Sequence, residues 1–135
     1  MRNVITIASI VFVLATPSLQ AAEMFDGLWA KTQKECRNKE GPDSRTFIGL
    51  GNVIGGKPAP LFDQYENHCR VDRKTPAGDG LVLTTTCFEF WDDYTKGAKG
   101  RKVTIRLSPG PKDTLRIDGK PYLLCKRKSD LPKKQ

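Results

Sequence analysis

The stretch RKVTIRLSPGPKDTLRIDGKPYLLCKR, residues 101–127, decides the fold that this sequence predicts. Its first part alternates apolar and polar side chains, which is the pattern of a β-strand with one buried face. The apolar positions are Val103, Ile105 and Leu107, and Leu115 and Ile117 continue them. Asp118-Gly119 is a two-residue hairpin signal, because a type I′ turn needs positive φ at both central positions. We therefore expect antiparallel hairpins with an apolar inner face and a basic outer face.

Turn signals separate similar short runs along the rest of the chain. They lie at residues 41–43, 55–58, 76–80, 99–100 and 108–111. Short β-type runs at this spacing predict an all-β fold, either a small antiparallel barrel or a sandwich. The near-match to a phosphate-binding loop at residues 51–58 has Pro58 where that loop needs Ser or Thr, so we interpret it as a Gly-rich turn.

The beginning of the chain has the pattern of a signal peptide. Arg2 precedes an apolar run at residues 4–15, and small residues follow up to Ala21. This pattern predicts a signal peptide over residues 1–21, since the run is shorter than the about 20 residues of a membrane helix. We expect a periplasmic or secreted monomer of one domain, residues 22–135, with no integral membrane segment and no cofactor.

The chain has four cysteines, Cys36, Cys69, Cys87 and Cys125. In an exported protein such an even set predicts disulfides, and the lack of a C-x-x-C pair argues against a zinc site. Four cysteines allow three pairings. We favour Cys36–Cys69 with Cys87–Cys125, which joins neighbours in sequence.

The charge of the chain points to anionic partners. Residues 1–21 hold one basic and no acidic residue, so the remainder carries (23 − 1) − 15 = +7. A basic surface favours nucleic acid, acidic lipids or other polyanions, and such binding weakens steeply with salt. The predicted polyanion-binding residues lie on the last strands and the basic C-terminal tail: Lys102, Arg106, Lys126, Arg127 and Lys128.

Residues 25–36 fit either a short helix or a strand, and we favour a strand. Their Gly27-Leu28-Trp29 resembles the Gly-x-Trp that opens the first strand of lipocalins and related secreted barrels, which include small bacterial protease inhibitors. The chain also resembles small four-cysteine exported proteins of Gram-negative bacteria. The resemblance implies a calycin-like barrel in which Arg116, Lys126 or Arg127 packs on Trp29.

The stretch LVLTTTCFEFWDDY, residues 81–94, predicts a strand that is buried on both faces and runs into an acidic turn. Asp92 and Asp93 point apart on an extended backbone, so we interpret them as turn residues and not as a catalytic pair. We expect both tryptophans, Trp29 and Trp91, to be buried.

The lone histidine belongs to the one catalytic candidate in the sequence. In YENHCRV, residues 65–71, Glu66, His68 and Arg70 share one face of an extended strand. A Glu base, a His acid and an Arg on phosphate are the groups that small secreted microbial ribonucleases use. The other interpretation is a polar stripe that faces solvent.

The sequence favours an exported, non-enzymatic binding protein, with a secreted ribonuclease-like enzyme as the alternative. The candidate ligands are a small apolar molecule inside the barrel, a polyanion, or a periplasmic or secreted hydrolase that a loop of this chain inhibits. A Ser-His-Asp set is not supported, because the sequence has one histidine and no nucleophile elbow.

Overall fold

The computed structural model describes residues 18–132. Residues 1–17 of the predicted signal peptide lie outside this range, and its predicted cleavage point after Ala21 falls within the first helix. Strands dominate the described part of the chain. The elements are α1 (Ser18–Phe25), β1 (Gly27–Ala30), η1 (Glu35–Arg37), β2 (Thr46–Gly49), β3 (Val53–Ile54), β4 (Lys57–Pro58), β5 (Leu61–Gln64), β6 (Asn67–Ala77), β7 (Gly80–Phe88), α2 (Trp91–Lys96), β8 (Arg101–Pro109), β9 (Thr114–Ile117), β10 (Lys120–Arg127) and η2 (Lys128–Asp130).

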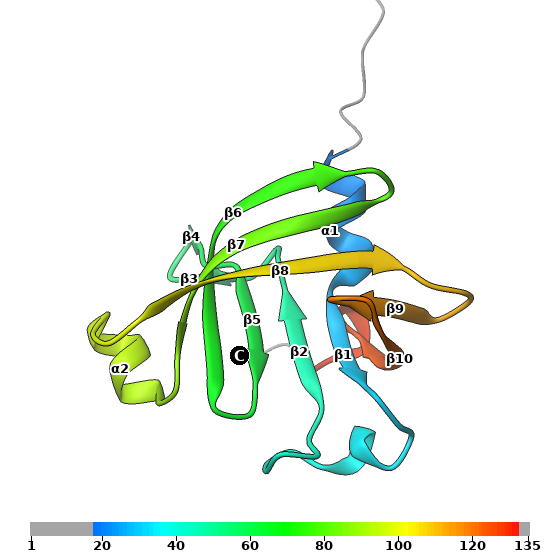
Figure 1. The fold of residues 1–135 in the computed structure, drawn as a ribbon, viewed down its shortest axis with the longest axis horizontal. Coiled ribbons are helices and arrows are strands. Elements are labelled where there is room, and N and C mark those ends of the chain that lie inside the picture. Colours follow the sequence, from blue (N-terminus) through cyan, green and yellow to red (C-terminus); the bar gives the residue numbers. More distant parts are fainter. Residues whose placement is uncertain (1–17, 133–135) are drawn as a thin grey trace, which may run out of the picture.

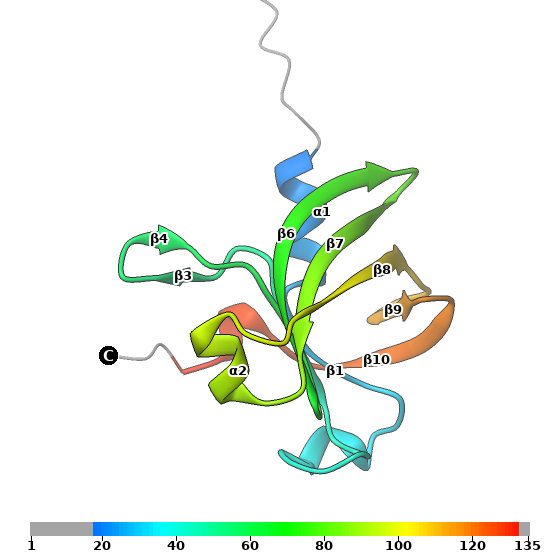
Figure 2. The same cartoon turned by 60° about the vertical axis from the view of Figure 1, so that its left-hand side comes forward.

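Eight of these strands form a closed antiparallel barrel (Figure 1). Around the barrel they follow chain order, β1, β2, β5, β6, β7, β8, β9 and β10, and β10 pairs back with β1. β3 and β4 form a separate hairpin that protrudes from the barrel (Figure 2). The predicted antiparallel all-β barrel is therefore confirmed, and its strands are joined in the order in which the chain presents them.

The inward-facing side chains of the barrel pack into one core. Each of the eight barrel strands contributes to this cluster of buried residues. Four of the five predicted apolar positions on β8 and β9 are buried, as their alternation requires: Ile105, Leu107, Leu115 and Ile117. The fifth, Val103, is partly buried and packs against the core. Between β9 and β10, Asp118 and Gly119 have φ of 49° and 79°, which confirms the predicted two-residue hairpin.

The segment at residues 25–36 is a strand between two helical turns. Trp29 of β1 is 3% exposed, and its Nε1 donates a hydrogen bond of 2.8 Å to the carbonyl oxygen of Phe25 at the end of α1. The predicted burial of Trp29 is therefore confirmed. The three basic residues that the resemblance implied for packing on Trp29 are exposed: Arg116, Lys126 and Arg127.

The run LFDQYENHCRV forms a hairpin, so the prediction of one continuous strand was wrong. β5 ends at Gln64 and β6 begins at Asn67, and these two residues pair across a turn at Tyr65-Glu66. Glu66 has a φ of 52°. The reversal was missed because neither turn residue is one of the Gly, Pro, Asn, Asp or Ser residues that mark turns.

The disulfide pairing differs from the predicted one. The bridges are Cys36–Cys125 and Cys69–Cys87, and no cysteine is free in the described residues. Cys69 and Cys87 are direct partners on β6 and β7, with Cα atoms 3.9 Å apart. Cys125 lies on β10, which pairs with β1, and the chain continues from β1 to Cys36 in η1. Nearness in sequence was a poor guide because barrel closure brings the first and last strands together.

The prediction that Trp91 is buried was wrong. The strand β7 ends at Phe88, and Trp91 begins α2 with 46% of its surface exposed. Asp92 and Asp93 lie in the first turn of α2 and not in a hairpin turn, at a helix end where carboxylates are favourable. Phe88 is buried, and Tyr94 of α2 packs edge-on against it, with ring centroids 5.6 Å apart.

The Gly-rich segment at residues 51–58 forms the protruding β3–β4 hairpin. Gly55 and Gly56 have φ of 57° and 75°, which suits a tight turn. This agrees with its interpretation as a turn. None of the helices in residues 18–132 has the length and hydrophobicity needed to cross a bilayer.

Candidate functional site

The register of the barrel aligns one side chain from each of five neighbouring strands on the outer wall. The successive partners are Leu28 of β1, Phe47 of β2, Asp63 of β5, His68 of β6 and Phe88 of β7. Their neighbours in sequence point inward because side chains alternate along a strand. All members of this row except Phe88 line a groove of about 560 Å³.

Three connecting segments complete the walls of this groove. They are the η1–β2 segment, the β5–β6 turn and the β7–α2 junction, and all three lie at the end of the barrel away from α1 (Figure 1, Figure 2). They contribute Lys39, Glu40, Ser44, Arg45, Tyr65, Glu66, Glu89, Phe90 and Trp91. We call this space the outer-wall groove.

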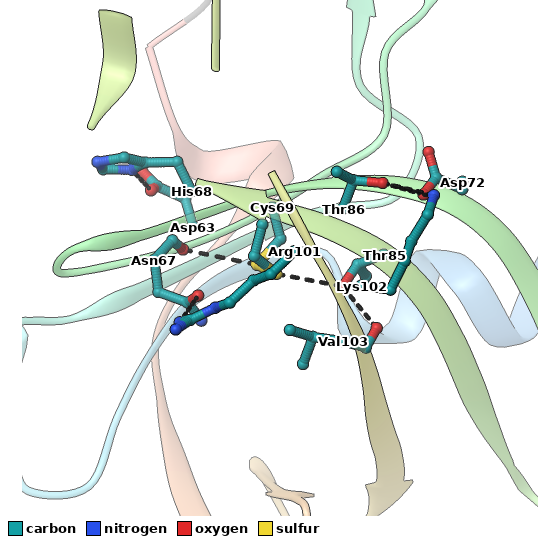
Figure 3. Close-up of a disulfide and its surroundings, with 11 residues drawn as sticks. Asp63, Asn67, His68, Cys69, Asp72, Thr85, Thr86, Arg101, Lys102 and Val103 are labelled. Carbon is teal, nitrogen blue, oxygen red and sulfur yellow. Dashed lines mark hydrogen bonds and ion pairs between the residues drawn. A yellow bond between two sulfur atoms is a disulfide. The ribbon is translucent and has the colours of Figure 1, made fainter. Parts of the chain in front are cut away.

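Asp63 and His68 form a close polar pair in the floor of the outer-wall groove. The His68 Nδ1 lies 2.6 Å from Asp63 Oδ1, and Figure 3 shows the two side chains together. The imidazole also stacks on Trp91, with ring centroids 4.1 Å apart and an interplanar angle of 24°. Tyr94 packs edge-on against Trp91 at 5.1 Å. These contacts hold the indole of Trp91 beside the floor of the groove.

The pair leaves the second nitrogen of His68 available. Burial raises the pKa of Asp63, and the hydrogen bond and charge of His68 oppose this shift. Among the side chains that the structure describes, those of residues 22–132, no nitrogen or oxygen is both fully buried and without a partner. His68 Nε2 makes no hydrogen bond in that part of the chain, so it reaches solvent. It can accept a hydrogen bond from a ligand, or donate one when the imidazole is protonated.

Exposed aromatic side chains gather at this groove. The described residues include six exposed large hydrophobic side chains, and half of them line the groove. These are Tyr65, Phe90 and Trp91, which are 47%, 57% and 46% exposed. A concentration of exposed aromatic surface around a concave site is typical of a binding site.

The structure separates the predicted trio of Glu66, His68 and Arg70. Glu66 lies in the β5–β6 turn and lines the outer-wall groove together with His68. Arg70 lies further along β6, where its Nε donates to Asp72 Oδ1 at 3.1 Å. The groove therefore combines the histidine and the glutamate of the trio, and Arg70 is not among its lining residues.

The predicted polyanion-binding residues lie on β8, β10 and η2, with β9 between β8 and β10. Three of them contact carboxylates: Lys102 with Asp72 at 3.0 Å, Arg127 with Asp113 at 2.9 Å, and Lys128 with Asp26 at 3.3 Å. Arg106 and Lys126 are exposed. These ion pairs reduce the charge that the five residues offer to a polyanion, and polyanion binding stays a prediction.

Asp72 is the centre of a hydrogen-bonded cluster on the outer wall (Figure 3). It accepts from Thr86 Oγ1 at 2.6 Å, from Lys102 Nζ at 3.0 Å and from Arg70 Nε at 3.1 Å. Burial by itself would raise the pKa of Asp72, but these donors outweigh it and lower the pKa from 3.8 to about 2. The ionised carboxylate is therefore favoured by folding.

Because of this lowered pKa, we expect the protein to lose stability in acid, and we expect Asp72→Asn to abolish this part of the pH dependence. The contribution is present above the unfolded pKa of 3.8 and is lost as pH falls through about 2. After allowance for solvent screening, we expect Asp72 to contribute about 1 kcal/mol to the free energy of unfolding. Urea unfolding at about pH 6 and about pH 2 measures it. Asp79→Asn, in the exposed β6–β7 turn, is the control. An unchanged pH dependence in Asp72→Asn would contradict the assignment.

Sequence patterns missed most of the groove. Asp63 and Phe47 carry no local signal, because only the register of β2, β5 and β6 places them beside His68. The signal for Phe90 and Trp91 was the density of aromatic residues in FEFWDDY, which we interpreted as a buried strand. The end of β7 at Phe88 turns these two side chains outward into the groove wall.

No group of three or more His, Cys, Asp and Glu side chains suited to a metal ion occurs in residues 18–132. No protein-family model, no curated protein and no solved structure matches this chain.

Proposed function

We propose that this chain is an extracytoplasmic, non-enzymatic binding protein and that the outer-wall groove is its binding site. The observation that carries the proposal is the convergence of Tyr65, Phe90 and Trp91 on one groove. Exposed aromatic side chains around a groove of about 560 Å³ suit a ligand that stacks on them. The two disulfides fit a protein of an oxidising compartment, and we propose a periplasmic or secreted location.

The packing of the barrel favours the outer wall over the lumen as the site. Inward-facing side chains from all eight strands join one buried cluster, which includes the large side chains of Trp29 and Phe62. A small apolar ligand in the lumen would have to displace these side chains. A calycin-type barrel remains our proposal for the fold family, supported by the eight-strand meander and by the Gly27-Leu28-Trp29 opening.

The ribonuclease alternative has one observation in its favour, the orientation of His68 by Asp63 at 2.6 Å in a groove that also contains Glu66. An imidazole held in this way suits acid–base chemistry. The absence of Arg70 from the lining residues disfavours it, and so does the excess of acidic over basic residues in the lining, because carboxylates repel a phosphodiester. We therefore favour binding without catalysis.

Fluorescence of Trp91 tests the proposed site. Trp29→Phe leaves Trp91 as the only tryptophan of a chain that has two. The probes are neutral oligosaccharides, heparin fragments, a short RNA, and cationic, neutral and acidic peptides. At least one of these probes should protect Trp91 from acrylamide quenching. Phe90→Ala should lower the affinity for that probe about tenfold, as loss of an aromatic anchor does.

Ile54→Ala is the matched control, because Ile54 is exposed on the β3–β4 hairpin and does not line the groove. It should leave the affinity unchanged. Failure of every probe to protect Trp91 would refute the groove as a binding site. Cleavage of the RNA by wild type but not by His68→Ala would support the ribonuclease instead.

A further inference from the structure

We propose that the outer-wall groove binds an arginine-bearing peptide segment, with a guanidinium group placed against the aromatic wall formed by Phe90 and Trp91. This inference rests on the proposed function, since it names the ligand class of the same groove. It follows from the charge of the groove, the position of its aromatic rings and its size.

The groove differs in charge from the rest of the chain. The whole chain has 23 Lys and Arg residues against 15 Asp and Glu residues, a net charge of +8. The groove reverses this ratio, with two basic and four acidic lining residues: Lys39, Arg45, Glu40, Asp63, Glu66 and Glu89. Solution ions screen distant charges beyond about 8 Å at physiological salt. A ligand inside the groove therefore interacts mainly with this local acidic excess.

Aromatic and acidic groups lie next to one another along the β7–α2 wall. Glu89 directly precedes Phe90 and Trp91, and all three line the groove. One side of the Trp91 indole stacks on His68, and 46% of the residue is exposed. A cation is attracted to the face of an indole or phenyl ring. A guanidinium at this wall would stack on a ring and donate hydrogen bonds to a carboxylate.

Guanidinium suits this wall better than an ammonium group. Its plane stacks on aromatic rings, it is weakly hydrated, and its donors match a carboxylate. An ammonium is a compact, strongly hydrated point charge, so it gains less from an open aromatic wall. The acidic lining of the groove also disfavours a polyanion, because the phosphates or sulfates of that ligand would face Glu66 and Glu89.

The dimensions of the groove and its η1–β2 wall favour a peptide segment over an isolated amine. The groove has a volume of about 560 Å³, and its floor crosses β1, β2, β5 and β6. Lys39 and Arg45 lie on the η1–β2 segment, where they can donate hydrogen bonds to peptide carbonyl groups. A chain that carries an arginine can therefore use both the acidic, aromatic wall and the two cations of the η1–β2 segment.

Anisotropy of a fluorescein-labelled hexapeptide with two arginines tests this inference. A peptide with citrulline in place of arginine is the matched ligand, because it keeps the shape and loses the charge. Wild type should bind the arginine peptide at least about tenfold more tightly, and this preference should decrease with salt. Glu89→Gln should lower the affinity for the arginine peptide about fivefold to tenfold and leave the affinity for the citrulline peptide unchanged.

Asp79→Asn is the control for the loss of one negative charge, because Asp79 is exposed and does not line the groove. It should leave both affinities unchanged. If the citrulline peptide, an oligosaccharide or heparin protects Trp91 as well as the arginine peptide does, the ligand class is wrong and the groove remains a binding site. If no probe protects Trp91, both proposals fall.

Discussion

Replacing Trp29 with alanine should lower the free energy of unfolding by about 3–5 kcal/mol. The side chain is 3% exposed and belongs to the core cluster of the barrel. Its removal leaves a cavity that the surrounding strands fill only partly. It also removes the 2.8 Å hydrogen bond from the indole Nε1 to Phe25, which connects β1 to the end of α1.

Urea unfolding followed by circular dichroism measures this effect without relying on tryptophan fluorescence. Trp91→Ala is the matched control, because it removes the same side chain from an exposed position. It should cost no more than about 1 kcal/mol, which is usual for surface changes that lose some packing. Equal losses from the two substitutions would mean that the two tryptophans do not differ in burial as described.

The double substitution Cys36→Ala/Cys125→Ala should be the other strongly destabilising change. This bridge closes a sequence separation of 89 residues, for which the chain-entropy treatment gives about 4–5 kcal/mol. It connects η1, which follows the first barrel strand, to the last strand β10. Loss of the bridge raises the conformational entropy of the unfolded chain. In the folded barrel, the β1–β10 pairing still closes the sheet.

Guanidinium unfolding of oxidised wild type and of the double variant measures this contribution. The control is the same comparison in a reductant that opens both bridges, where the two proteins should unfold at nearly the same concentration. Peptide mapping without reductant checks the pairing itself. A fragment that joins Cys36 to Cys69 would contradict the connectivity described here, and a persistent stability difference under reduction would point to packing instead of the crosslink.

Local sequence patterns were sufficient to predict most of the barrel. Alternation along β8 and β9 identified Ile105, Leu107, Leu115 and Ile117 as inward-facing, because side chains of a strand alternate between two faces regardless of what packs on them. The Asp118-Gly119 turn was predictable for a similar reason, since its φ values depend on the two residues themselves. The even number of cysteines predicted that all four are bonded.

The tertiary structure decided which of these elements meet. The cysteine partners depend on the closure of β10 onto β1 and on the register of β6 with β7, and neither leaves a trace in cysteine spacing. Trp91 is exposed because β7 ends at Phe88 and the chain starts a helix, a competition between strand and helix that aromatic density alone did not resolve.

The outer-wall groove is the clearest case of this division. His68 was recognisable as a candidate from its residue type, but Asp63 and Phe47 became its neighbours only through the pairing of β2, β5 and β6. The turn at Tyr65-Glu66 is what brings Asp63 opposite His68, and it contains no residue that marks a turn. The sequence by itself thus determined the faces of the strands, which are local properties. The site depends on strand register and barrel closure, which are set by the packing of the whole chain.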